Sequence, residues 1–156
     1  MTETLATKSK PKTTNNEQRT TNNAFEPLIV VFCCNWCSYS GADLAGTSRI
    51  QYPSNIRIIR VMCSGMVHPK LVLQALNKGA DGVMILGCHP GDCHYLDGNI
   101  RTQSRKEAID LLLDDADIDR KRFRLEWVSA SEGPRFAQVI KEMVDQVKEV
   151  GPNKPA

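Results

Sequence analysis

The chain has 156 residues, a formal net charge of +2 and 41% hydrophobic residues. This length suits a single domain whose core is large enough to fold without disulfide or metal staples. Residues 1–25 hold four of the 20 basic and two of the 18 acidic side chains, so the rest of the chain is balanced, which argues against a nucleic-acid-binding protein.

The apolar runs are too short to cross a bilayer, and the N-terminus lacks the apolar segment of a secretion signal. We therefore expect a cytoplasmic protein without a membrane partner. Six cysteines in a cytosolic chain of this size indicate metal binding or redox chemistry more than disulfide bonding.

Composition divides the chain into three parts. Residues 1–25 are rich in Thr, Asn and Lys and nearly devoid of apolar side chains, so we expect a disordered tail. Residues 26–152 carry the apolar periodicity of one folded domain, and residues 153–156 form a short C-terminal tail.

Four apolar runs predict strands, at Leu28–Phe32, Ile56–Met62, Gly82–Leu86 and Phe123–Trp127. Helical periodicity fills the intervals, at about residues 41–50, 68–79, 100–113 and 134–151. Strands that alternate with helices predict a single-domain, doubly wound α/β fold, with a mostly parallel sheet of about four strands and helices on both faces. Phe123–Trp127 alternates apolar and charged side chains, which favours an edge strand. Ser40 and Asp43 are spaced as a capping pair for the first helix.

Every cysteine lies where a predicted strand ends and before the next helix. In parallel sheets these positions share the carboxyl edge, where ligands gather. We therefore expect the loops to meet there and to present Cys34, Cys37, Cys63, Cys88 and Cys93 as candidate ligands. Cys33 adjoins Cys34, and since neighbouring strand residues face opposite ways, it should point away as a buried, inert thiol.

Three interpretations of these thiols compete. A thioredoxin-like pair would use Cys34 and Cys37 alone and would leave Cys88 and Cys93 without a role. A structural zinc would use four thiolates, although zinc chiefly staples domains too small to fold alone. An iron–sulfur cluster also needs about four thiolates, and it explains both the number and the placement of the cysteines.

Other side chains near the cysteines admit more than one role. His89 and His94 could be ligands, although a supporting hydrogen bond or a docking role fits better because thiolates are already in excess. Trp36 and Tyr39 could shield the site, contact a partner or simply pack. No pattern for substrate chemistry is visible, so one cluster without a substrate site favours an electron relay.

Five segments together carry a family resemblance. They are Cys-Cys-Asn-Trp-Cys-Ser-Tyr (33–39), Gly-Ala-Asp-Leu-Ala-Gly (41–46), Ile-Arg-Val-Met-Cys-Ser-Gly (59–65), Gly-Cys-His-Pro-Gly-Asp-Cys-His-Tyr (87–95) and Glu-Trp-Val-Ser-Ala-Ser-Glu-Gly (126–133). The chain resembles the delta, iron–sulfur subunit of methyl-viologen-reducing (F420-non-reducing) hydrogenase over about residues 26–152. Two features depart from the family pattern: the long N-terminus, and Met66 with His68 beside Cys63.

The resemblance implies one [2Fe-2S] cluster and a place in the heterodisulfide reductase system of methanogenesis. Electrons would come from a nickel–iron hydrogenase or a formate dehydrogenase and pass to the bifurcating flavin in the large reductase subunit. By motif, the candidate ligands carried over are the same five thiols, Cys34, Cys37, Cys63, Cys88 and Cys93. The alternative that remains is a zinc-stapled bridging module with no redox role.

Overall fold

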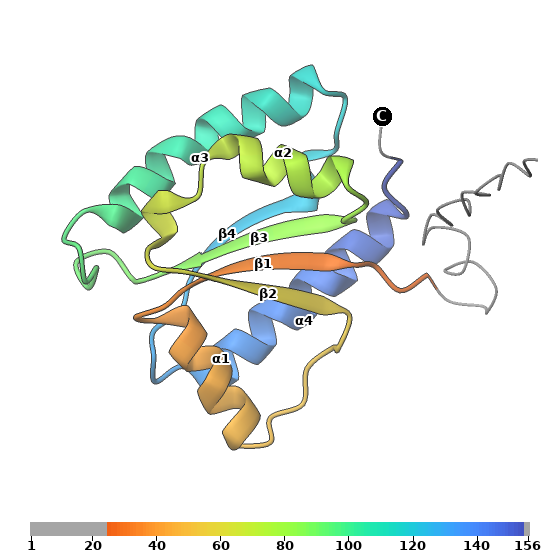
Figure 1. The fold of residues 1–156 in the computed structure, drawn as a ribbon. Helices are drawn as coiled ribbons and strands as arrows, with labels where there is room; N and C mark the ends of the chain where they lie inside the picture. Colours follow the sequence, from red (N-terminus) through yellow and green to blue (C-terminus); the bar gives the residue numbers. More distant parts are fainter. Residues whose placement is uncertain (1–24, 155–156) are drawn as a thin grey trace, which may run out of the picture.

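The computed structural model describes residues 25–154, and Figure 1 shows their fold. One sheet of four parallel strands has the order β2-β1-β3-β4. The strands are β1 (Ile29–Cys34), β2 (Ile56–Val61), β3 (Gly82–Gly87) and β4 (Phe123–Trp127). The helices are α1 (Ser38–Thr47), α2 (Pro69–Asn77), α3 (Gly98–Asp115) and α4 (Gly133–Val150), with the single turns η2 (Ser64–Met66) and η3 (Arg120–Arg122).

Helices cover both faces of the sheet, so the predicted doubly wound α/β fold is confirmed (Figure 1). On one face α1 and α4 pack against alternate strand residues, with Phe136 and Met143 fully buried. On the other face α2 and α3 bury Leu76 and Ile109 against the remaining strand residues. The continuous apolar run of β3 follows from this arrangement, because a central strand is covered on both faces.

Several predicted boundaries near the cysteines differ from the structure, and the two largest differences are at β1 and α1. β1 continues through Cys33 and Cys34, because both residues pair with the end of β2. α1 begins at Ser38 with Cys37 as its N-cap, so the predicted capping pair of Ser40 and Asp43 is wrong. The Ser40 hydroxyl instead donates to the Asn35 carbonyl at 3.4 Å.

The two ends of the described chain meet at one carboxylate. The buried Asp81 accepts a hydrogen bond from the Leu28 N–H at 2.8 Å and another from the Asn153 N–H at 2.9 Å. Arg122 donates to the backbone carbonyl groups of Asp81 and Gly151 beside them. This clasp precedes β1 and β3, so both ends lie at the amino edge of the sheet. The predicted disordered tail, apart from Phe25, lies outside the described residues.

The strand order places a crevice at the opposite edge. The chain moves from β1 to β2 on one side and then returns to β3 on the other side of β1. At such a reversal the loops that follow β1 and β3 diverge, and the carboxyl ends of these two strands flank a binding crevice. No helix within residues 25–154 is long and apolar enough to cross a membrane.

Candidate metal centre

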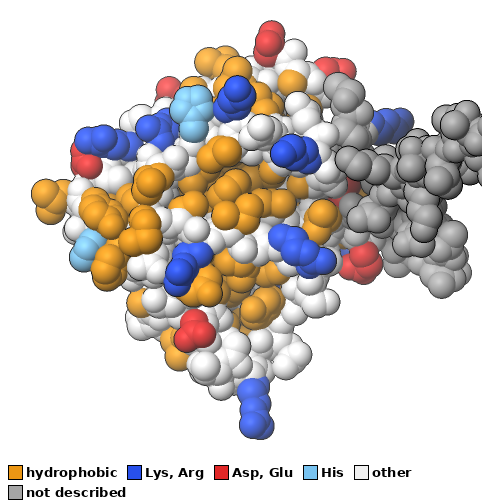
Figure 2. All heavy atoms as spheres, viewed as in Figure 1, with side chains coloured by type: hydrophobic (Ala, Val, Ile, Leu, Met, Phe, Trp, Pro, Cys, Tyr) orange, Lys and Arg blue, Asp and Glu red, His pale blue; other side chains and the backbone are white. Residues whose placement is uncertain are grey.

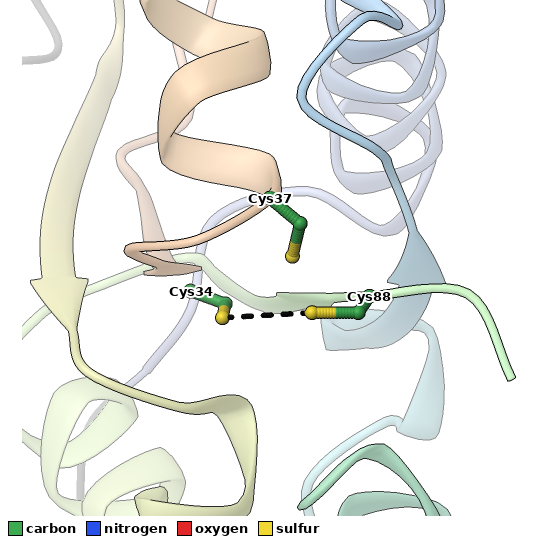
Figure 3. Close-up of side chains that lie close together, drawn as sticks. All are labelled: Cys34, Cys37 and Cys88. Carbon is green, nitrogen blue, oxygen red and sulfur yellow. Dashed lines mark hydrogen bonds between the residues drawn. The ribbon is translucent and has the colours of Figure 1, made fainter. Parts of the chain in front are cut away.

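Three thiols converge at this crevice. Cys34 is the last residue of β1, Cys37 caps the start of α1, and Cys88 directly follows β3. Their Sγ atoms all lie within 4.8 Å of one another, and all three residues are buried (Figure 3). The Sγ atoms of Cys34 and Cys88 are 3.8 Å apart, although the residues are 54 positions apart in sequence. Pairing of β1 with β3 therefore builds this three-thiol group.

The three thiols do not ionise alike. Hydrogen bonding from Cys37 lowers the pKa of Cys34 to about 5, against the opposing effect of burial. The same hydrogen bond and burial raise the pKa of Cys37, and burial raises that of Cys88 to about 11. The thiolate of Cys34 is thus stabilised by hydrogen bonds from its neighbours, whereas burial disfavours the thiolates of Cys37 and Cys88. Close, buried sulfurs that ionise fully only beside positive charge fit a soft metal or an iron–sulfur cluster.

The other two candidate ligands form a pair beside the three-thiol group. Cys63 follows β2 and Cys93 lies in the loop after β3, and both reach the first residue of α3. A Cβ atom at Gly98 would lie 3.1 Å from the Sγ of Cys93 and still closer to that of Cys63. Burial is the main cause that raises the pKa of Cys63, with contributions from Cys93 and Cys34. Cys63 therefore lies within electrostatic reach of Cys34, and all five predicted ligands occupy one edge.

Cys33 points to the other face of the sheet, as the alternation predicted. It is fully buried in the core formed with α1 and α4. Burial raises its pKa to about 12, so it stays a neutral thiol at physiological pH.

Polar residues fix the loops that carry the thiols. The buried Asn99 amide donates to the carbonyl oxygens of Cys88 at 3.2 Å and His89 at 2.7 Å. Ser38 donates to the Leu86 carbonyl at 2.7 Å, which ties the start of α1 to the end of β3. Sequence reasoning missed both residues, because a single polar side chain at a helix start carries no distinctive signal.

Neither histidine of the loop joins the three-thiol group. His89 Nε2 lies 2.6 Å from the Glu132 carboxylate, which also accepts the Ser129 N–H at 2.8 Å. These contacts, the Ser129 N–H first, lower the pKa of Glu132 to about 2. His94 stacks on Trp36 with ring centroids 3.8 Å apart. The hydrogen bond of His89 links the cysteine loop to the start of α4.

Aromatic side chains join the two main cysteine loops at the surface. Besides stacking on His94, Trp36 donates from Nε1 to the Tyr95 hydroxyl at 3.3 Å. Trp36 and Tyr95 are nearly half exposed. These rings link the loop after β1 to the loop after β3 and also present an apolar surface to solvent.

A groove of about 420 Å³ opens beside this surface and reaches Cys63. Met62, Met66, Tyr95 and Arg101 are among the residues that line it. Of the five thiols, Cys63 is therefore the one that lines this surface groove, beside the flexible apolar side chains of Met62 and Met66.

The fold is a doubly wound α/β domain with five thiols at the carboxyl edge of its sheet, three of them grouped closely enough to hold a metal ion, so the class is that of α/β proteins with a cysteine metal-binding group. Residues 29–151 match the family described as methyl-viologen-reducing hydrogenase, delta subunit. The chain belongs to this family, and the predicted family resemblance is confirmed.

Three relatives show the range of proteins that contain this region. The chain is 53% identical over 128 residues to the F420-non-reducing hydrogenase vhc iron-sulfur D subunit of Methanococcus voltae, covering 82% of this chain and 89% of the relative. It is 46% identical over 130 residues to the F420-non-reducing hydrogenase iron-sulfur D subunit of Archaeoglobus profundus, covering 83% and 95%. It is 50% identical over 126 residues to the A subunit of the ferredoxin/F420H2-dependent CoB-CoM heterodisulfide reductase of Methanosarcina acetivorans, covering 81% of this chain but 16% of that relative.

Proposed function

We propose that the chain binds one [2Fe-2S] cluster through four of the five thiols Cys34, Cys37, Cys63, Cys88 and Cys93. The observation that carries this proposal is the three-thiol group, whose buried Sγ atoms lie within 4.8 Å of one another next to a second pair of thiols. Four thiolates are the usual ligand set of such a cluster. Zinc is the second candidate, because three thiolates and a fourth from the pair would also suit it. Two observations favour iron: the hydrogenase relatives are named iron–sulfur subunits, and the domain has two apolar cores and needs no staple.

We further propose that the chain is a cytoplasmic electron-transfer subunit without catalysis of its own. Electrons enter from a nickel–iron hydrogenase or a formate dehydrogenase and leave to the large, flavin-containing A subunit of heterodisulfide reductase. Support comes from the hydrogenase relatives, and from the relative in which this region is part of the reductase A subunit itself. When bound, the cluster would supply one-electron redox chemistry.

The residues of the chain serve this role in distinct ways. The three buried thiols would hold the cluster away from water. The Asn99 side chain fixes the backbone at Cys88 through its hydrogen bond to the Cys88 carbonyl. The hydrogen bond between Trp36 and Tyr95 ties together the two loops that carry Cys37 and Cys93. The groove that reaches Cys63 gives a protein partner a close approach to the thiols.

Cluster content and electron exchange test the proposal together. Anaerobically purified protein should be brown and contain about two iron and two sulfide per chain, with an EPR signal that appears on reduction. A colourless protein with about one zinc and no sulfide would establish the structural alternative. The protein is first reduced by H₂ and hydrogenase, or by formate and formate dehydrogenase, and the donor is then removed. Reoxidation on adding heterodisulfide reductase together with the CoB-CoM heterodisulfide as the oxidant tests the relay. A protein that stays reduced after that addition would contradict it.

A further inference from the structure

The charges of the chain are unevenly distributed along its sequence. Between Asp43 and Asp81 there is no carboxylate, while five basic side chains occur: Arg49, Arg57, Arg60, Lys70 and Lys78. The whole chain has 18 acidic against 20 basic residues, so this stretch is distinctly basic. It contains β2, which is an edge strand of the sheet, and η2 and α2, which follow β2 in the chain.

Exposed apolar side chains occupy the same region. β2 is an edge strand of the sheet, and Ile59 on it is 43% exposed. Leu71 on α2 is 38% exposed, Met62 46% and Met66 64%. We call these four residues, with Lys70 on α2 and with Arg60, which projects from β2 toward Tyr39 of α1, the β2–α2 surface. Figure 2 shows the corresponding face: hydrophobic side chains spread across its middle, with Lys and Arg around them and Asp and Glu mostly toward its edges.

The cations of this surface have no acidic partners among residues 25–154. Arg60 lies over the Tyr39 ring, 5.2 Å from its centroid, and neither it nor Lys70 forms a salt bridge there. By contrast, Arg124 on the opposite edge strand pairs with two glutamates. Arg60 and Lys70 could therefore form ion pairs with carboxylates of another molecule.

This surface is continuous with the opening of the thiol site. Met62 and Met66 belong to it and also line the groove that reaches Cys63. A molecule seated on β2 and α2 would consequently cover the groove and lie against the site of electron exchange.

We propose that the β2–α2 surface docks the heterodisulfide reductase A subunit, through a face of that protein with an apolar centre and carboxylates around it. This inference rests on the proposed function and specifies where the acceptor binds. An apolar centre with a charged rim is the usual composition of a protein–protein interface, and opposite charge steers the encounter. The choice of this partner follows from the relative that contains this region within the same polypeptide.

Other occupants fit the charges less well. A second copy of the chain would bring the same cations together across a symmetric contact. Residues 1–25 carry more basic than acidic side chains, so they offer little complementary charge. The exposed apolar centre does not suit a nucleic acid, whose binding depends mainly on cations that contact phosphates.

A different explanation of the cations makes an opposite prediction. Edge strands commonly carry charged side chains that prevent pairing with other sheets. If Arg60 served only that purpose, its reversal would promote self-association and would leave partner binding unchanged.

The test is a pair of charge reversals, Arg60→Glu with Lys70→Glu, measured on the cluster-loaded protein. The matched control is Lys121→Glu with Lys141→Glu, because these exposed lysines lie elsewhere and the net charge changes equally. Binding to the immobilised reductase A subunit is measured anaerobically by biolayer interferometry at low and high salt. The test variant should bind about tenfold or more weakly at low salt, whereas the control should stay within about twofold of the wild type.

The single variant Lys70→Glu separates a loss of binding from a failure to fold. Lys70 is exposed in the first turn of α2, where a carboxylate favours the helix, so this variant should fold and load iron as the wild type does. Unchanged binding of the reductase partner by both variants would overturn the proposed surface. Loss of binding to the hydrogenase alone would overturn the assignment of its occupant. A wild-type protein that binds iron but neither binds the reductase partner nor is oxidised by it would instead contradict the proposed function.

Discussion

Gly98 and Cys63 lie in direct contact: the Cys63 Sγ occupies the space that a side chain at position 98 would need. The Cys93 Sγ lies on the same glycine, 3.1 Å from the position of that absent Cβ. A side chain at the first residue of α3 would collide with two thiols, so glycine fits this position.

Gly98→Ala should displace Cys63 and lower the iron bound per chain by about half or more. Overpacking of this kind typically costs about 1–3 kcal/mol, and here the atom that must move is a candidate ligand. Iron per chain and the EPR spectrum of the reduced protein measure the effect. Gly46→Ala is the control, because nothing lies within 4 Å of a Cβ in that helical position. Normal iron and an unchanged spectrum in Gly98→Ala would show that Cys63 does not contribute to the site.

Single Cys→Ser substitutions should divide the six cysteines into three groups. We expect Cys34, Cys37 and Cys88 to be required for most of the bound iron, because their Sγ atoms form the three-thiol group. At least one of Cys63 and Cys93 should also be required, since a cluster needs a fourth thiolate. Iron and sulfide per chain after anaerobic purification give the result. Full iron in Cys88→Ser would refute the proposed cluster site.

Cys33→Ser is the internal control of this series. Its side chain lies in the core on the other face of the sheet, so its loss should leave iron near normal. The substitution places a hydroxyl in apolar surroundings and should cost about 1–3 kcal/mol of stability. A clear loss of iron with little loss of stability would instead assign Cys33 to the site.

Asp81→Ala should destabilise the fold without acting at the thiols. Two backbone N–H groups, those of Leu28 and Asn153, would lose their acceptor, at a cost of about 2–4 kcal/mol in total. Urea unfolding of the cluster-loaded protein under anaerobic conditions measures this free energy. Asp145→Ala, at an exposed position of α4, should change it by less than about 0.5 kcal/mol. Similar stabilities for the two variants would show that the clasp contributes little.

The sequence predicts the elements well because each strand is a short apolar run bounded by loop residues. Gly82–Leu86 is the clearest case, since its burial on both faces requires an unbroken apolar sequence. Boundaries at the cysteines were less predictable. β1 extends to Cys34 because it pairs with Val61 of β2, and this pairing is formed by distant residues.

The grouping of the thiols could be predicted only in part. Alternation along β1 separates Cys33 from Cys34, and this follows from local geometry alone. Which other thiols meet Cys34 depends on strand order, because β3 and β2 lie on opposite sides of β1. Nothing in the local sequence states that order, so the grouping of Cys34 with Cys88 and of Cys63 with Cys93 required the structure.

The clasp at Asp81 brings both ends of the domain to one place, so the domain can be joined to other polypeptides there. Because the chain enters and leaves beside one carboxylate, with the thiols at the far edge of the sheet, a longer polypeptide can continue from either end without crossing the thiol site. The same unit can therefore serve as a separate subunit, as in Methanococcus voltae, or as one segment of a much larger chain, as in Methanosarcina acetivorans. Joining the domain to a partner requires only a linker at the amino edge of the sheet, and the thiol site at the carboxyl edge stays unchanged.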